Sequence, residues 1–251
     1  MQNAKCKMQI LNFLLIFFLL SFSIKAESVD NNGSKGTINI KSDRVEYTSK
    51  DEEEVAVFTG SVEFKKGELT VYSDKMQMYS QGKKAIGEDN VKIVIDTEKE
   101  NRVMTGGYFE YHRDNEYAVL KKNSKMIIIN KKQESGKDNG SKDVKKSKDF
   151  KELVVTSEIM EMFSKDGYSR AKGAVIIEEG DRKAYCEEAV YYEKEDKVVM
   201  TGSPRIEQKE NKFQGEKMTL FLKEDRLIIE GKVEGTVLEE GDKVDKEPES
   251  P

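Results

Sequence analysis

Apolar and polar residues alternate along most of the chain, a pattern that is typical of β-strands with one buried face. The clearest example is the segment 55–79, VAVFTGSVEFKKGELTVYSDKMQMY. It predicts three strands, at 55–59, 62–65 and 69–78, joined by Gly60-Ser61 and by 66–68. Gly60 has no Cβ, so it tolerates the positive φ of a tight connection.

This segment recurs along the chain. ELTVYSDKMQMY (68–79) and ELVVTSEIMEMF (152–163) share Glu, Leu, Val, Ser and two Met at an offset of 84 residues. Thr-Gly-Ser occurs at 59–61 and again at 201–203. Repetition at a fixed spacing indicates stacked units that share one continuous core. The chain is therefore expected to form an elongated β-structure with one interior along its length.

The same pattern defines the predicted domain organisation. Strand-sized segments recur from 37 to 238 and predict roughly 15 to 18 strands in an all-β fold. We expect a first β-unit at 37–129 and a second at 151–238. Between them, 130–150 is a lysine-rich linker or insertion, and 239–251 is an acidic tail with two of the three prolines that is predicted to be disordered.

The N-terminus has the features of an export signal. Two lysines precede the apolar run 10–22, and Ala26 offers a small residue at a cleavage position. The run is shorter than the roughly 20 residues that a membrane-spanning helix needs. We therefore predict that 1–26 is a signal peptide and that the mature protein is exported. Ile24 is a poor cleavage residue, so the alternative is that 1–26 is retained as an N-terminal membrane anchor.

Composition argues against catalytic, metal and nucleic-acid sites. The formal net charge is −5, with acids and bases well mixed, so no nucleic-acid partner is expected. His112 is the only histidine, placed in a predicted turn, and Cys186 is the one cysteine after the signal. Neither residue type can supply a converging ligand set, so no metal or other cofactor is predicted. No nucleophile or phosphate-binding motif occurs, and the protein is predicted not to be an enzyme.

The candidate binding residues form an apolar stripe along the predicted strands. The null hypothesis is an ordinary packed core. Frequent methionine, no tryptophan and only 36% hydrophobic residues favour instead a groove that two curved sheets leave unfilled, lined by side chains that adapt to lipid chains. The predicted lipid-binding residues are Phe58, Val62, Phe64, Leu69, Val71, Met76, Met78, Val91, Ile93, Leu153, Val155, Met160, Met162, Val175, Met218 and Leu220.

Several motifs resemble the OstA-like repeats of the LptA family of lipopolysaccharide-transport proteins. They are SDRVEY (42–47), AVFTGSV (56–62), GELTVYSDKMQMY (67–79) and VMTG (103–106), with a looser likeness over 151–238. The sequence departs from the family pattern at the lysine-rich insertion and at Leu120-Lys121-Lys122, which stands where Thr-Gly is expected.

The resemblance implies a fold and a function. The fold would be a twisted β-jellyroll of stacked antiparallel strands, open at both ends. The function would be that of a periplasmic lipopolysaccharide carrier or bridge, with the lipid A acyl chains in the apolar interior. LptC-like and LptD-like proteins, or further copies in a head-to-tail homo-oligomer, would pair with its edge strands. The alternatives are an LptC-like membrane-anchored subunit and a ligand-free structural β-solenoid.

Overall fold

The computed structural model describes residues 38–50, 53–79, 83–98, 100–131, 152–222, 224 and 226–238. The predicted export signal at 1–26, most of the predicted linker and the predicted tail at 239–251 lie outside these ranges.

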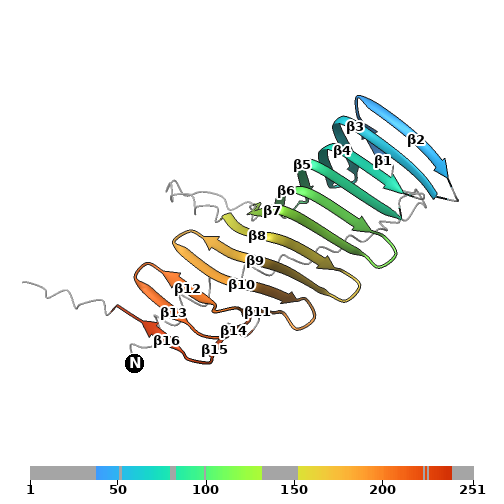
Figure 1. Ribbon diagram of the computed structural model, residues 1–251. Coiled ribbons are helices and arrows are strands. Elements are labelled where there is room, and N and C mark those ends of the chain that lie inside the picture. The colour runs from blue at the N-terminus through green and yellow to red at the C-terminus, as the bar shows by residue number, and fades with distance from the viewer. Residues whose placement is uncertain are drawn as a thin grey trace, which may run out of the picture.

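The described chain is all-β, and its 16 strands form one elongated antiparallel sheet (Figure 1). This confirms the predicted fold class and falls within the predicted number of strands. The described ranges contain no helix of the length and apolarity that a membrane crossing requires. The strands are β1 (Ile38–Lys41), β2 (Arg44–Lys50), β3 (Glu53–Lys66), β4 (Leu69–Tyr79), β5 (Lys84–Asp96), β6 (Glu100–His112), β7 (Tyr117–Asn130), β8 (Glu152–Phe163), β9 (Tyr168–Glu179), β10 (Arg182–Tyr192), β11 (Lys197–Thr201), β12 (Arg205–Gln208), β13 (Asn211–Gln214), β14 (Lys217–Phe221), β15 (Arg226–Glu230) and β16 (Glu234–Thr236).

The long strands are bent in the middle, and β3 shows how. Gly60 and Ser61 have φ of 78° and 45°, and the pairing of β3 with β4 changes register between Thr59 and Val62. The positive φ predicted at Gly60 is thus confirmed. The prediction that Gly60-Ser61 separates two strands is wrong: β4 pairs with β3 on both sides of the bend, so both halves belong to one strand.

The bend continues across the sheet and forms a corner. Alternate strands carry consecutive residues with positive φ there, namely Asp89-Asn90, Lys122-Asn123, Gly173-Ala174 and Gly202-Ser203. Lys122-Asn123 makes the corner where the sequence lacks the expected Thr-Gly, which shows that this bend does not need glycine. The Ser124 hydroxyl donates to the Leu120 carbonyl across the bend at 2.9 Å, so a backbone acceptor freed by the corner is satisfied.

The corner divides the sheet into two walls. Wall 1 consists of β1, β12, β13, β16 and the segments 62–66, 69–73, 91–96, 100–105, 124–130, 152–157, 175–179 and 182–186. Wall 2 consists of β2, β11, β14, β15 and the segments 53–59, 75–79, 84–88, 108–112, 117–121, 159–163, 168–172 and 188–192. We call the hairpin ends of the two walls rim 1 and rim 2.

The core lies between the walls and is continuous from Val62 to Leu222. Strand β7 pairs with β8 from Tyr117–Phe163 to Ile129–Glu152, so the sheet is unbroken across the lysine-rich segment. The order β3 to β10 follows the chain, which is the meander that short hairpins produce. The result is one long interior enclosed by two walls of one folded sheet.

Candidate lipid-binding interior

All 16 predicted lipid-binding residues lie in the interior. Ten of them belong to the fully buried core, and Phe58, Phe64, Leu69, Met78, Met160 and Met162 are partly buried and pack against it. Their alternation along each strand places them on the inner face of the folded sheet. The structure therefore brings the predicted set together in one apolar cluster.

A pocket occupies the middle of this interior, between β5 and β9. Its cavity volume is about 30 Å³, which is room for about one water molecule. At this place the side chains fill the space that we expected two curved sheets to leave open. The lining residues are Ile93, Met104, Phe109, Val119, Leu120, Met126, Val155, Met160, Glu161, Met162, Ser169, Arg170 and Ala171.

Only four of these lining residues were predicted as binding residues: Ile93, Val155, Met160 and Met162. Met104, Phe109, Leu120 and Met126 were missed, although each stands at an inner position of an alternating strand. Four of the lining residues are methionines, namely Met104, Met126, Met160 and Met162 on the adjacent strands β6 to β8, and the unbranched thioether repacks at low cost. The pocket is therefore a deformable apolar region of the core.

Rim 1 carries charged side chains that face inward, which the apolar pattern did not predict. Glu100 and Arg102 are 6% and 7% exposed and form an ion pair on β6. Glu179 and Arg182 are 2% and 8% exposed, with 3.6 Å between Oε2 and Nη1. Burial of a charge is costly unless it is paired, and both pairs meet that requirement. They give the apolar interior a polar border at its mouth.

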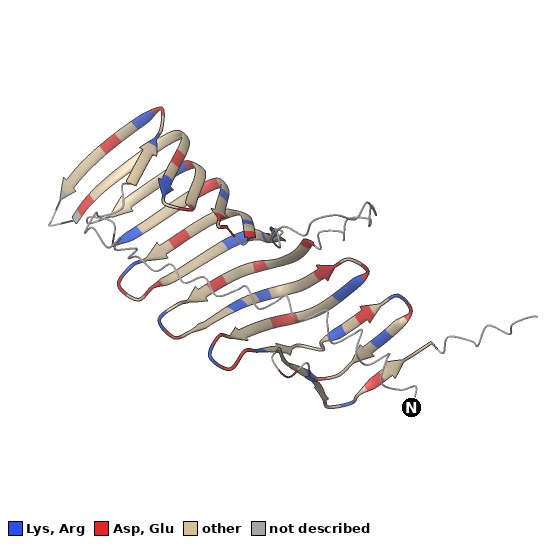
Figure 2. Cartoon of the chain, turned by 180° about the vertical axis from the view of Figure 1, so that it is seen from behind, with Lys and Arg blue, Asp and Glu red and all other residues tan. Residues whose placement is uncertain are grey.

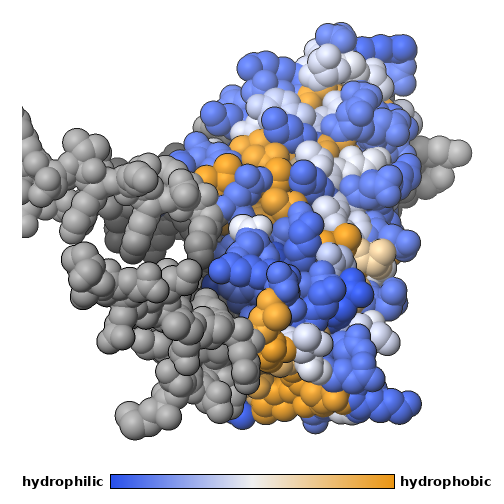
Figure 3. Space-filling view, turned by 90° about the vertical axis from the view of Figure 1, so that its left-hand side faces the viewer, coloured by the Kyte–Doolittle hydropathy of each residue, from blue (hydrophilic) through white to orange (hydrophobic). Residues whose placement is uncertain are grey.

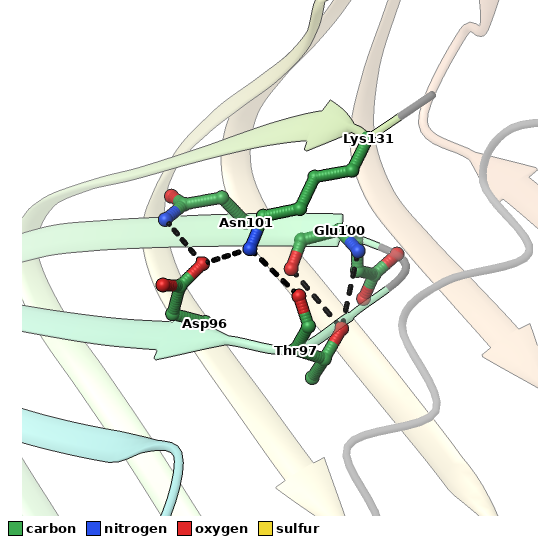
Figure 4. Close-up of polar contacts among 5 residues, drawn as sticks. All are labelled: Asp96, Thr97, Glu100, Asn101 and Lys131. Carbon is green, nitrogen blue, oxygen red and sulfur yellow. Dashed lines mark hydrogen bonds and ion pairs between the residues drawn. The ribbon is translucent and has the colours of Figure 1, made fainter. Parts of the chain in front are cut away.

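Hydrogen bonds and an ion pair hold the same rim together where the chain leaves β7 (Figure 4). Lys131 Nζ donates to Asp96 Oδ1 at 2.6 Å and to the Thr97 carbonyl at 2.8 Å. Asn101 Nδ2 donates to the same Asp96 oxygen at 3.1 Å. These bonds from Lys131 and Asn101 lower the pKa of the Asp96 carboxyl. The ends of β5, β6 and β7 are thus tied together where the chain leaves β7.

Rim 2 carries an outward-facing row of aromatic and cationic side chains, one from each of ten successive strands. Ring centroids lie 5.0 Å apart for Tyr117–Phe163 and 4.4 Å apart for Phe163–Tyr168. Such pairs contribute about 0.5–1.5 kcal/mol each. The row, which we call the rim ladder, is Tyr79, Lys84, His112, Tyr117, Phe163, Tyr168, Tyr192, Lys197, Phe221 and Arg226.

His112 is the last residue of β6 and a member of this ladder, so its predicted place in a turn is wrong by one residue. Its Nε2 lies 2.7 Å from Glu110 Oε1. Burial of Glu110 acts to raise its pKa, but hydrogen bonds from Tyr108, Lys84 and His112 outweigh it and lower the pKa to about 2. The outer face of wall 2 is thus held by charge-assisted hydrogen bonds.

Both ends of the sheet expose apolar side chains. At one end Val45 and Tyr47 on β2 are 57% and 63% exposed. At the other, Val233, Val237 and Leu238 are 54%, 51% and 52% exposed. Figure 3 shows hydrophobic surface at the bottom of the view, at the level of β14 to β16 in Figure 1. Among the described strands β2 pairs only with β3, and β16 only with β13, so both present a free strand edge.

Comparisons with known proteins identify the family of this chain. The family model described as LptA/(LptD N-terminal domain) LPS transport protein matches residues 39–226. The solved structure of LptH from Pseudomonas aeruginosa, titled as the LptA homologous periplasmic component of the lipopolysaccharide transport device, matches with 13% identity and a TM-score of 0.22. That match covers 82% of this chain and 97% of LptH. No curated protein sequence matches the chain. Because the family model covers most of the chain, the protein belongs to the LptA/LptD N-terminal domain family of lipopolysaccharide transport proteins.

Proposed function

We propose that this protein is a periplasmic lipopolysaccharide carrier that shields the lipid A acyl chains between its two walls. The observation that carries the proposal is the single apolar cluster that runs from Val62 to Leu222 through all the long strands. A carrier that spans between membranes needs an apolar path of this kind along its whole length. The family is described as one of transport proteins, so the proposal includes no catalytic step.

The energetics support a shielded path. Each buried methylene contributes about 0.8 kcal/mol, so a twelve-carbon acyl chain costs roughly 9 kcal/mol to expose to water. A glycolipid with several such chains meets a prohibitive barrier if it crosses water unaided. Transfer along a continuous apolar interior removes most of that cost.

The filled pocket sets a condition on this proposal. A cavity of about 30 Å³ does not hold an acyl chain, so binding requires the walls to move apart or the methionines to repack. Rim 1 and rim 2 share no strand pairing among the described residues, so separation of the walls breaks no backbone ladder there. Backbone hydrogen bonds hold neighbouring strands together on both sides of the corner. The walls therefore stay joined at the corner, and the corner is the line about which they open.

The two free edges support the proposed partners. Exposed apolar residues beside unpaired strand edges are a template for edge-to-edge pairing. We propose that β2 and the β15–β16 end pair with LptC-like and LptD-like proteins or with further copies. Pairing of one end of a copy with the opposite end of the next copy does not form a closed ring, so it extends the interior from copy to copy. The periplasmic location rests on the export signal predicted at 1–26, and LptH is titled as a periplasmic component.

Binding of glycolipid by the full chain tests the proposal. Native mass spectrometry of protein purified with lipopolysaccharide should show a bound glycolipid. Met160→Glu, on the inner face of β8, should remove it. Ile159→Glu is the matched control, because the neighbouring side chain points to the outer face of the same strand. Thermal unfolding checks that both variants remain folded.

A ligand-free structural sheet is the second candidate, and the small cavity volume favours it. It predicts no bound glycolipid in the parent protein or in either variant. Equal retention of glycolipid in Met160→Glu and Ile159→Glu would place the lipid outside the interior and overturn the proposal.

A further inference from the structure

The outer faces of the two walls differ in charge. Wall 2 presents acids along its outer face, among them Glu88, Glu110, Glu161 and Glu188. Each of these carboxylates forms an ion pair with a lysine or arginine of wall 2. Figure 2 shows acidic and basic residues interspersed along the strands of the sheet. This face is internally neutralised.

The outer face of wall 1 is different over β4 to β8. Between the corner and rim 1 its outward residues on these five strands form two registered rows without an acid, and the acids Asp96 and Glu152 stand beyond these rows at the rim 1 ends of β5 and β8. One row runs through Val94, Val103, Ile127 and Val154, which pair in sequence across β5 to β8. The ten residues of these two rows, here called the wall 1 platform, are Thr70, Tyr72, Lys92, Val94, Val103, Thr105, Lys125, Ile127, Val154 and Thr156.

The platform combines apolar surface with unneutralised positive charge. Lys92 and Lys125 are exposed and stand in the row beside the valines and isoleucine. Tyr72 is 38% exposed, and Lys92 Nζ lies 6.0 Å from the centroid of its ring. Ile129, also 38% exposed, extends the apolar row toward rim 1.

We propose that the wall 1 platform is a contact surface for an anionic phospholipid membrane. Lysines attract anionic head groups, tyrosine suits the head-group level, and a short apolar row reaches the boundary of the acyl region. The ten platform residues include two lysines and no acid, which matches a surface of uniform negative charge. Across five strands the platform measures about 19 Å at 4.8 Å per strand, broad enough to lie flat on a leaflet. This contact is separate from the interior, so it does not depend on the proposed carriage of lipid.

An environment-sensitive fluorophore tests the contact on the full chain. The NBD label is attached to a cysteine at Thr105 on the platform or at Thr201, an outward-facing threonine of wall 2, in a background with Cys6→Ser and Cys186→Ala. We expect a blue shift at Thr105, and none at Thr201, when vesicles contain phosphatidylglycerol. The label reports which face of the sheet touches the membrane. Anchoring of the chain through the apolar run at 10–22 would not by itself produce a blue shift at Thr105 and none at Thr201.

Charge variants complete the test. Lys92→Gln with Lys125→Gln should weaken the response at Thr105 by roughly 30-fold in lipid concentration, as two lysine contacts imply. Replacing the six lysines from 132 to 148 by glutamine should leave the shift in place. The proposal is overturned by an equal shift at Thr201, an equal shift with purely zwitterionic vesicles, or no shift at Thr105. Loss of the shift only in the six-lysine variant also overturns it.

Discussion

Gly60 and Gly202 occupy equivalent places on the corner, one in β3 and the other directly after β11, each with a φ of 78°. Each is followed by a serine with positive φ, so the Thr-Gly-Ser repeat of the sequence is a repeat of the bend. The corner is what folds one sheet into two facing walls. The residues that recur most clearly in the chain are therefore those that create the interior.

Gly202→Ala should destabilise the fold. A Cβ at this position would overlap the Cβ of Glu187 and lie 2.6 Å from its Cγ, in a backbone conformation that side chains disfavour. We expect a loss of about 1–3 kcal/mol in the free energy of unfolding. Gly87→Ala is the control, because the nearest atoms would lie 3.7 Å away. Thermal melts that show equal effects at the two positions would contradict the role of the corner.

Glu110 should make stability depend on acid pH. Its folded-state pKa is about 2 against an ordinary value of 4.5. Its contribution to the free energy of unfolding is therefore present above pH 4.5 and is lost as the pH falls toward 2. Glu110→Gln should cost about 1–2 kcal/mol at pH 7, because it weakens hydrogen bonds to a charged acceptor. The difference between parent and variant should shrink as the pH falls.

Urea titrations at several pH values measure this effect. Asp114→Asn, in the exposed turn after β6, serves as the control. A difference between parent and Glu110→Gln that stays constant from pH 7 to pH 2 would show that the carboxylate has no special partners.

Cys186 should resist alkylation in the folded protein. Burial, and then the charge of Glu187, raise the pKa of its thiol to about 12, and the residue is 6% exposed. In a Cys6→Ser chain, iodoacetamide at pH 8 should react at least about a hundredfold more slowly than after unfolding in guanidinium. Rapid labelling of the native chain would mean that the two walls separate readily even without lipid.

Lysines at the β2 edge should weaken head-to-tail association. Val45→Lys with Tyr47→Lys places two charges on an exposed free edge, a device by which natural sheets avoid pairing. Sedimentation velocity over a concentration series should show the association constant fall at least about tenfold, which corresponds to 1.4 kcal/mol. Tyr72→Lys, an exposed change on the sheet face, should leave the association unchanged.

The alternating pattern predicted the interior well because a period of two residues assigns each side chain to a face. It placed Val62, Val155 and Met218 inside, as the structure does. The corner could not be predicted in this way. Whether Gly60-Ser61 ends a strand or bends it depends on pairing with β4, which the local sequence does not specify.

The polar features of the site were missed for a different reason. Glu179 and Arg182 stand at inner positions of β9 and β10, but a search for apolar residues passes over charged ones. The rim ladder depends on the register of ten strands at once, and neighbours such as Tyr117 and Phe163 are far apart in sequence. Only the spatial arrangement reveals either feature.

Photo-crosslinking from two adjacent residues of β6 tests directly whether lipopolysaccharide lies between the walls. Phe109 is buried and lines the pocket, whereas Tyr108 points outward and donates to Glu110 Oε2 at 2.6 Å. With a benzoyl-phenylalanine at each position in turn, we expect a lipopolysaccharide adduct from position 109 and none from position 108. Adducts from position 108 alone, or from neither position in a chain that transports lipopolysaccharide, would contradict carriage between the walls.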